Sequence, residues 1–237
     1  MAYKALSASI AWAQQFNFNR NLALGAGSEP AVSSANIIKQ TILGPPFSWP
    51  WNRDVITFTC TASTQDYSET VADFGFVEQA AVQDINSANT KWLELTNKIC
   101  LPVASETALP EYIAAQTDSG TGTITFRLQP VPDAAYPVSV TVQKACVDFA
   151  DTTGDWGPIP NRYSYIYNWG FLALMYLYAD DPRFQVTNQK FVANLLGAAQ
   201  GLTQTQVNIF LANWQQITGT EIANQGQLAQ GTQSRAL

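Results

Sequence analysis

The run from Tyr163 to Ala179 constrains the fold of this chain more than any other segment. It is apolar or aromatic on nearly every side, and its only strongly polar side chains are Ser164 and Asn168. A helix that is hydrophobic all round must be buried all round, in a large core, in a bilayer or in a subunit interface. The choice among these three environments decides most of what the protein can do.

The ends of this run carry helix boundary signals. Pro158 and Pro160 precede it, and proline is well placed near a helix start because its missing N–H would have had no partner there. Asn161 is predicted to cap the first turn. Asp180-Asp181-Pro182 ends the run, since the residue before a proline disfavours helical geometry. The pattern therefore predicts one helix over Tyr163–Ala179.

A bilayer does not suit this helix. At about 1.5 Å per residue it spans roughly 25 Å, short of a hydrocarbon core of ~30 Å. Tyrosines belong at membrane edges, whereas here they are spread through the run, at Tyr163, Tyr165, Tyr167, Tyr176 and Tyr178. We therefore expect burial in a protein core or between subunits, and no membrane partner.

The composition removes several classes of function. The net charge is −6, only 13% of residues are charged and no Lys/Arg cluster occurs, which argues against a nucleic-acid or membrane-surface site. Histidine is absent, which removes the commonest general base and the commonest zinc ligand. Cys60, Cys100 and Cys146 form no CxxC pair, so buried reduced thiols are expected. The N-terminal residues lack the apolar stretch of a signal peptide, which favours synthesis in a cytosol.

Secondary-structure signals divide the chain into four zones. Residues 1–48 are predicted as a helical segment, with helices over Lys4–Phe16 and from a Ser28 cap to Leu43. Residues 49–149 form a β-rich module, residues 150–217 return to helix, and the polar residues 218–237 are an extended tail. In the module, strands are predicted at Val55–Cys60, Phe74–Gln79, Trp92–Leu95, Thr121–Leu128 and Val138–Val142, and one short helix at Ala104–Ala115. Thr121–Leu128 and Val138–Val142 make the clearest pair of strands.

In the C-terminal zone, helices are predicted over Gln185–Gln200, with Gly201 as its C-cap, and over Gln204–Gln216, with Thr203 as its N-cap. The fold class that follows is α+β. A helical bundle is formed by the N- and C-terminal segments, and a β-sandwich or barrel-like module is inserted between them. Such an insertion is physically easy because domain termini often lie close together.

No catalytic, metal or cofactor site is predicted. The carboxylates that could pair, Asp66 with Glu69 and Asp73 with Glu78, fit turns between strands better than an acid–base pair. Asp151–Asp155 (DTTGD) lacks the alternating ligands and closing glutamate of a cation loop, so a structural loop is expected. For Trp49, Trp51, Tyr67 and Trp92 the expected role is packing, although a carbohydrate site on the β-module remains conceivable.

Six sequence blocks, taken in order, resemble one protein family. They are Trp49-Pro50-Trp51-Asn52-Arg53, Gln65-Asp66-Tyr67, Thr125–Asp133 (TFRLQPVPD), Gln143-Lys144, Trp156-Gly157-Pro158-Ile159-Pro160 and Asp181-Pro182-Arg183-Phe184. Together they are similar to the head-to-tail adaptor (connector) proteins of short-tailed bacteriophages. The resemblance covers residues 49–184.

The resemblance implies a structural virion protein without enzymatic activity. In that family a helical bundle with a β-rich insertion assembles as a ring, usually dodecameric, beneath the portal protein. The ring joins the capsid to the tail or nozzle protein and encloses the channel through which genomic DNA passes without specific binding. Residues expected at a subunit or packing interface are Trp156, Pro158, Tyr163, Tyr167, Trp169, Phe171, Tyr176 and Tyr178. Residues expected to dock the tail on the portal are Ile222, Leu228 and Leu237.

Two alternatives remain open at this stage. One is another phage neck or tail protein, a tail tube or a tail terminator. The other, from a different class, is a monomeric β-sandwich module that binds carbohydrate and uses its helices as a scaffold. An enzyme is a more distant alternative, because it would need carboxylates that converge on a cleft.

Overall fold

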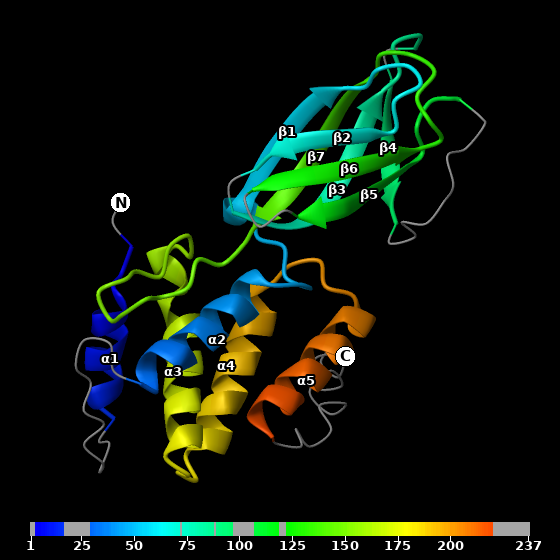
Figure 1. Ribbon diagram of the computed structural model, residues 1–237. Helices are drawn as coiled ribbons and strands as arrows, with labels where there is room; N and C mark the ends of the chain where they lie inside the picture. The colour runs from blue at the N-terminus through cyan, green and yellow to red at the C-terminus, as the bar shows by residue number, and fades with distance from the viewer. Residues whose placement is uncertain are drawn as a thin grey trace, which may run out of the picture.

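The chain folds into a helical part and a β part that lie one above the other (Figure 1). The computed structural model describes residues 3–16, 29–71, 73–87, 89–96, 107–118 and 122–219. The α-helices among these residues are α1 (Leu6–Gln14), α2 (Ala31–Leu43), α3 (Ser164–Tyr178), α4 (Phe184–Ala198) and α5 (Gln204–Thr218). Two short 3₁₀ helices, η1 (Pro50–Asn52) and η2 (Asn161–Tyr163), stand at the boundary between the parts. The fold class is mixed α+β.

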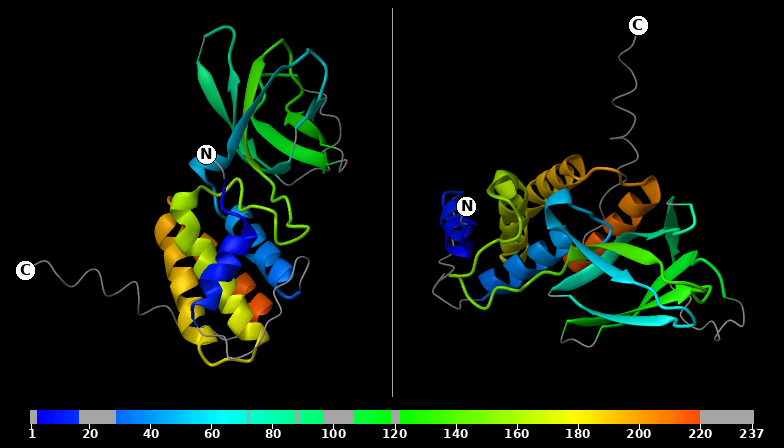
Figure 2. Two further views of the ribbon diagram at one scale, coloured as in Figure 1. Left: turned by 90° about the vertical axis from the view of Figure 1, so that its left-hand side faces the viewer. Right: turned by 90° about the horizontal axis from the view of Figure 1, so that it is seen from above.

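Helix α3 is the centre of the helical part. It contacts α1, α2 and α4, and Figure 2 shows these helices gathered around it. One hydrophobic cluster contains buried residues of all five helices, so segments before and after the β part share a core. Helix α5 joins this core through Phe210, which meets Phe47 at 5.0 Å between ring centroids, and through Trp214, which meets Phe191 at 5.0 Å.

The predicted boundaries of α3 are confirmed to within one residue at each end, but the predicted cap is wrong. Helix α3 begins without a side-chain cap, after the 3₁₀ turn η2. The Oδ1 atom of Asn161 instead accepts a hydrogen bond from the backbone N–H of Lys4, at 3.0 Å. The side chain therefore fastens the segment before α1 to the start of α3.

The β part is a seven-stranded, nearly closed, barrel-like sheet. Its strands follow the order β1-β7-β3-β4-β5-β6-β2, and every neighbouring pair is antiparallel except the short parallel pair β4–β5. The barrel interior is a second hydrophobic cluster, built on Phe126, Leu128 and the alternating valines of β7. The strands are β1 (Arg53–Thr59), β2 (Asp66–Thr70), β3 (Phe74–Gln83), β4 (Thr90–Leu95), β5 (Tyr112–Asp118), β6 (Thr123–Gln129) and β7 (Pro137–Lys144).

Three expectations for the β part are wrong. Tyr112–Asp118 is strand β5, where the sequence predicts a helix over Ala104–Ala115; residues 104–106 of that range lie outside the described part. Asp66 and Tyr67 open strand β2 instead of forming a turn. Strands β6 and β7, the strongest strand signals, are not neighbours, because β6 pairs with β2 and β5 whereas β7 pairs with β1 and β3.

The C-terminal helices follow the sequence signals closely. Thr203 caps α5 in a capping box, in which its hydroxyl accepts the N–H of Gln206 and the Gln206 side chain accepts the N–H of Thr203. Helix α4 ends at Ala198, so Gly201 is not its cap. Thr218 is the buried last residue of α5 and not the first of a tail. Ile222, Leu228 and Leu237 lie outside the described residues, as do Ser28 and Cys100.

Candidate subunit-contact surfaces

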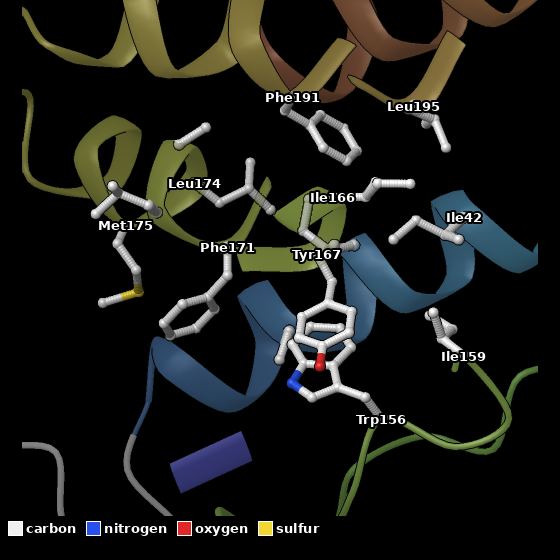
Figure 3. Close-up of a cluster of buried hydrophobic side chains, with 14 of the residues drawn as sticks. Ile42, Trp156, Ile159, Ile166, Tyr167, Phe171, Leu174, Met175, Phe191 and Leu195 are labelled. Carbon is white, nitrogen blue, oxygen red and sulfur yellow. The ribbon is translucent and has the colours of Figure 1, made fainter. Parts of the chain in front are cut away.

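Four of the predicted interface residues lie inside the molecule, around α3. Trp156 and Tyr167 are fully buried and stacked, with ring centroids 4.2 Å apart and an angle of 9° between the planes (Figure 3). The indole N–H of Trp156 donates to the hydroxyl of Ser9 at 2.9 Å. Phe171 and Tyr176 are also buried. These four side chains pack the core of one copy and are not available to another.

The chain thus covers almost the whole of its most apolar helix by itself. Along α3, only Tyr165 and Tyr178 are exposed, at the two ends of the helix. Gly170 permits the close approach of its neighbours, since a Cβ at this position would lie 2.7 Å from Cδ2 of Phe191 and 2.8 Å from Cδ1 of Ile38. The burial that the sequence demands therefore does not require a neighbouring subunit.

The other four predicted interface residues keep accessible surface. Pro158, Tyr163 and Trp169 are half-buried, and Tyr178 is 66% exposed. Trp169 belongs to an aromatic group with Trp12 and Phe16, with centroids 5.3 and 5.6 Å away, and the ammonium of Lys190 lies 4.4 Å from its ring. Of the eight predicted interface residues, these four are therefore the ones that a second copy can reach.

A buried amide joins the barrel to the helical part. Gln143, at the end of β7, is fully buried. Its Oε1 accepts the N–H of Trp49 at 3.2 Å, and its Nε2 donates to the carbonyl of Trp49 at 3.3 Å and to Oε2 of Glu78 at 2.8 Å. Asn52 adds a bond from its Nδ2 to the carbonyl of Lys144, at 2.9 Å. The two chain segments that cross between the parts are therefore tied to each other.

Glu78 ends this hydrogen-bonded chain with an ion pair to Arg53. Nε of Arg53 donates to Oε2 of Glu78 at 2.7 Å, and a second bond joins the Nη2 and Oε1 atoms. Burial alone would raise the pKa of the Glu78 carboxyl, but the hydrogen bonds from Arg53 and Gln143 outweigh it, so that the pKa lies below its usual value. The carboxylate stays ionised and holds strands β1 and β3 at the boundary.

A cleft of about 390 Å³ opens beside this ion pair, between the two parts. The rings of Trp49 and Trp51 stack in its wall at 5.3 Å, and Tyr163 lies 5.9 Å from Trp51. The guanidinium of Arg162 lies 5.0 Å from the Tyr163 ring centroid, and within the described part of the chain it makes no ion pair. The indole N–H of Trp51 is buried and has no hydrogen-bond partner among the described residues. The aromatic wall of this cleft therefore has Arg162 as a basic neighbour.

Helix α2 binds residues 147–155, the segment through which the chain returns from the barrel to the helical part. The ammonium of Lys39, only 3% exposed, donates to the carbonyls of Val147 and Asp155 at 2.8 and 3.1 Å and lies 4.5 Å from the Phe149 ring. Asn36 bonds both the N–H and the carbonyl of Phe149. Burial lowers the pKa of Lys39. The two carbonyls and the ring stabilise the charged ammonium, and through them Lys39 fixes the chain segment that leaves the barrel to helix α2.

Three of the aspartates named in the sequence make local structural contacts. Asp66 forms two 2.7 Å bonds with Arg127 across strands β2 and β6, and Oδ1 of Asp151 accepts the N–H and hydroxyl of Thr153. Asp181 pairs with Arg183 at 2.6 Å. Among the described residues, no group of three or more Cys, Asp or Glu side chains is arranged to hold a metal ion.

The two described cysteines are reduced and unreactive by environment. Burial raises the pKa of the Cys60 thiol to about 11 and that of Cys146 to about 12. Because the thiolate is the reactive form, neither is poised as a nucleophile at neutral pH. None of the helices within the described ranges combines the length and apolar character needed to cross a membrane.

Sequence reasoning missed the residues that matter most at the boundary. Gln143 and Lys39 have no local signal, since each bonds a segment distant in the chain, and the position of Arg162 beside Trp51 likewise depends on the fold. The blocks Trp49–Arg53 and Gln143-Lys144 stand out in the sequence only by resemblance. Comparison of the chain with models of known protein families and with curated proteins finds no match.

Proposed function

We propose that this protein is a head-to-tail adaptor of a short-tailed bacteriophage, a structural virion protein with no enzymatic activity. Copies form a ring, dodecameric in the family it resembles, that joins the portal protein to the tail or nozzle protein and encloses the DNA channel. The protein is assembled in the host cytoplasm and resides at the head–tail junction. In this proposal the N- and C-terminal segments form one helical bundle that carries the barrel as an insertion.

One observation supports the proposal best: the sequence blocks that resemble the adaptor family meet in pairs in space. Trp49 and Asn52 of the first block bond Gln143 and Lys144 of the fourth. Asp66 of the second block pairs with Arg127 of the third. Residues so far apart in the chain form a framework that fixes the barrel and its joint. This is what a structural component needs, and it differs from a set of residues converging on a reaction centre.

The proposal assigns no residue to DNA binding. The acidic net charge of −6 suits a ring that DNA slides past, since a cationic lining would hold DNA by counterion release. We expect neutral or acidic side chains at the channel.

The tail that contains Ile222, Leu228 and Leu237 is proposed to dock on the portal. Removal of residues 220–237 should leave the fold intact and abolish docking.

The decisive experiment mixes the purified protein with the portal protein of the same genome. Light scattering gives the mass of the complex, and negative-stain microscopy gives its symmetry. We expect rings on the portal, including when the free protein is monomeric. A protein that stays monomeric and does not bind the portal would refute the adaptor proposal. A tail tube or terminator would form rings without the portal.

One observation favours the carbohydrate-binding alternative. On the barrel, Trp92 is 65% exposed on β4, and Tyr112, 37% exposed, lies on the neighbouring strand β5. Exposed aromatic rings on a sheet can stack on sugars. If this is the function, Trp92→Ala abolishes retention in affinity electrophoresis on polysaccharide gels and leaves portal binding unchanged. An adaptor shows no such retention in the first place.

A further inference from the structure

The boundary cleft has the composition of an interface hot spot. Trp51, Tyr163 and Arg162 line it, and these three residue types dominate the binding energy of protein interfaces. Its charged side chains are Arg53, Arg162 and Glu78. Glu78 neutralises the charge of Arg53, so the cleft keeps one net positive charge, that of Arg162, although the chain as a whole is acidic. The cleft is thus suited to an aromatic or apolar group next to a carboxylate.

The turn between α3 and α4 carries that combination. Tyr178 ends α3 with 66% of its surface exposed, the largest value among the described bulky apolar side chains. Asp180 follows, exposed, and its carboxylate makes no hydrogen bond or ion pair with the described residues. The adjacent Asp181 is paired with Arg183. The turn therefore presents one aromatic ring and one net negative charge.

These two features stand at opposite ends of the same helix. Arg162 and Tyr163 immediately precede α3, and Tyr178 and Asp180 are at its end. Fifteen residues at about 1.5 Å each separate them by roughly 22 Å. Figure 1 shows the α3–α4 turn at the end of the helical part away from the barrel, whereas the cleft adjoins the barrel. A rigid helix prevents the turn from reaching the cleft of its own copy.

We propose that Tyr178 and Asp180 of one copy bind in the Trp51–Tyr163–Arg162 cleft of the next copy. The tyrosine ring packs against the aromatic wall, and the Asp180 carboxylate pairs with the Arg162 guanidinium. The contact joins two different surfaces, the turn of one copy and the cleft of the next, so it is head-to-tail. Head-to-tail contacts close into rings when the rotation between copies allows it. This inference rests on the proposed ring and names the surfaces that build it.

Charge reversal tests the pairing. Arg162→Glu and Asp180→Arg are each mixed with the portal protein, and assembly is followed by light scattering and negative-stain microscopy. We expect at least a tenfold rise in the protein concentration needed for assembly, because like charges now face each other. Glu94→Arg, a reversal at an exposed residue of β4, is the matched control and should assemble as the unmodified protein does.

Mixing the two single variants gives the sharper result. In an equimolar mixture the reversed cleft of the Arg162→Glu variant can take the reversed turn of the Asp180→Arg variant. The unmodified cleft of the second variant can take the unmodified turn of the first. Alternating rings with an even number of copies should therefore form. The double variant, with both reversals, should also assemble alone, and circular dichroism on each variant confirms that it is folded.

The outcomes separate this inference from the adaptor proposal. If the unmodified protein forms rings and the single variants form them equally well, the contact is wrong and the adaptor proposal stands. Failure of the mixture to restore assembly of folded variants also overturns the contact. If the variants lose portal binding but keep contacts between copies, the cleft takes a portal segment instead of a second copy. A protein that never assembles refutes both.

Discussion

The helical part and the barrel reach a buried core by different means. The helical core is rich in aromatic rings: Trp156, Tyr167 and Phe171 are fully buried on or against α3, and Phe191 and Trp214 are fully buried on α4 and α5. The barrel core is mainly aliphatic and comes from alternation along strands, as in β7, where Val138, Val140 and Val142 point inward. A helix without a polar face has to be buried on all sides, whereas a strand with one buried face needs only every second residue to be apolar.

The largest expected effect tests whether these cores are independent. Trp156→Ala removes a fully buried ring and its bond to Ser9, and should cost about 3–5 kcal/mol. Because the two clusters are separate, we expect the urea transition of the helices, followed by circular dichroism at the helix band, to move to lower urea. The barrel transition should stay in place. Phe126→Ala, a buried ring of the barrel, should do the opposite. One common transition moved equally by both variants would show that the parts unfold together.

The joint between the two regions is tested by Gln143→Leu. The change leaves the backbone groups of Trp49 without their partners, which should cost about 1–3 kcal/mol. Because these bonds join β7 to Trp49, which packs in the helical core, their loss should broaden the distribution of distances between spin labels on the barrel and on α4. Gln83→Leu, at an exposed position of β3, is the control. An unchanged distance distribution would mean that Asn52 and Lys39 hold the joint without Gln143.

An effect of similar size tests how tightly α3 is packed. Gly170→Ala places a methyl group 2.7 Å from the Phe191 ring and 2.8 Å from Ile38, and should cost about 1–3 kcal/mol. Gly197→Ala in α4 is the matched control, because apart from its chain neighbours and its own helix backbone no atom of the described residues lies within 4 Å of the new Cβ. That variant should gain roughly 0.5–1 kcal/mol from helix propensity. Equal free energies of unfolding for the two variants would contradict the packing around α3.

The contrast between the two parts also explains which elements are visible in the sequence. The five described α-helices lie within a few residues of their predicted ranges, since continuous apolar patterns and caps such as Thr203 are local signals. Strands β2 and β5 escape prediction because each contributes few side chains to the barrel core: Tyr67 in β2 lies between Asp66 and Ser68, and Ile113 in β5 is followed by the helix-favouring Ala114 and Ala115. Their pairing with β6 decides their structure, and pairing is not local.

The candidate site is predictable from the sequence only in part. Tyr178 is among the predicted interface residues, as an aromatic in a helix that has to be buried. Its exposure does not follow from the sequence, because it depends on α3 ending there, at the turn. Arg162 carries no signal of its own, since its relation to Trp51 exists only after the chain has returned from the barrel. The cleft forms only when segments that are distant in the sequence come together in the fold.

The smallest expected effect concerns the pH dependence of the barrel. The hydrogen bonds from Arg127 hold the pKa of Asp66 below its usual value. A carboxyl with a lowered pKa in the folded state stabilises the protein above its unfolded pKa of about 3.9, and this stabilisation is lost as the pH falls through the folded pKa. Both side chains are partly exposed, with 43% and 26% of their surface accessible, so screening limits the contribution to about 0.5 kcal/mol.

Asp66→Asn should therefore lower the urea midpoint of the barrel transition slightly at pH 7, and its effect should shrink as the pH falls through the folded pKa of Asp66 and the unmodified carboxyl becomes protonated. Asp66 and Arg127 both lie in the barrel, so the helical transition should not respond to the substitution at any pH. The measurement is the difference in urea midpoint between the variant and the unmodified protein as a function of pH. A difference that stays constant from pH 7 to pH 2 would show that Asp66 acts through packing on β2 and not through its charge.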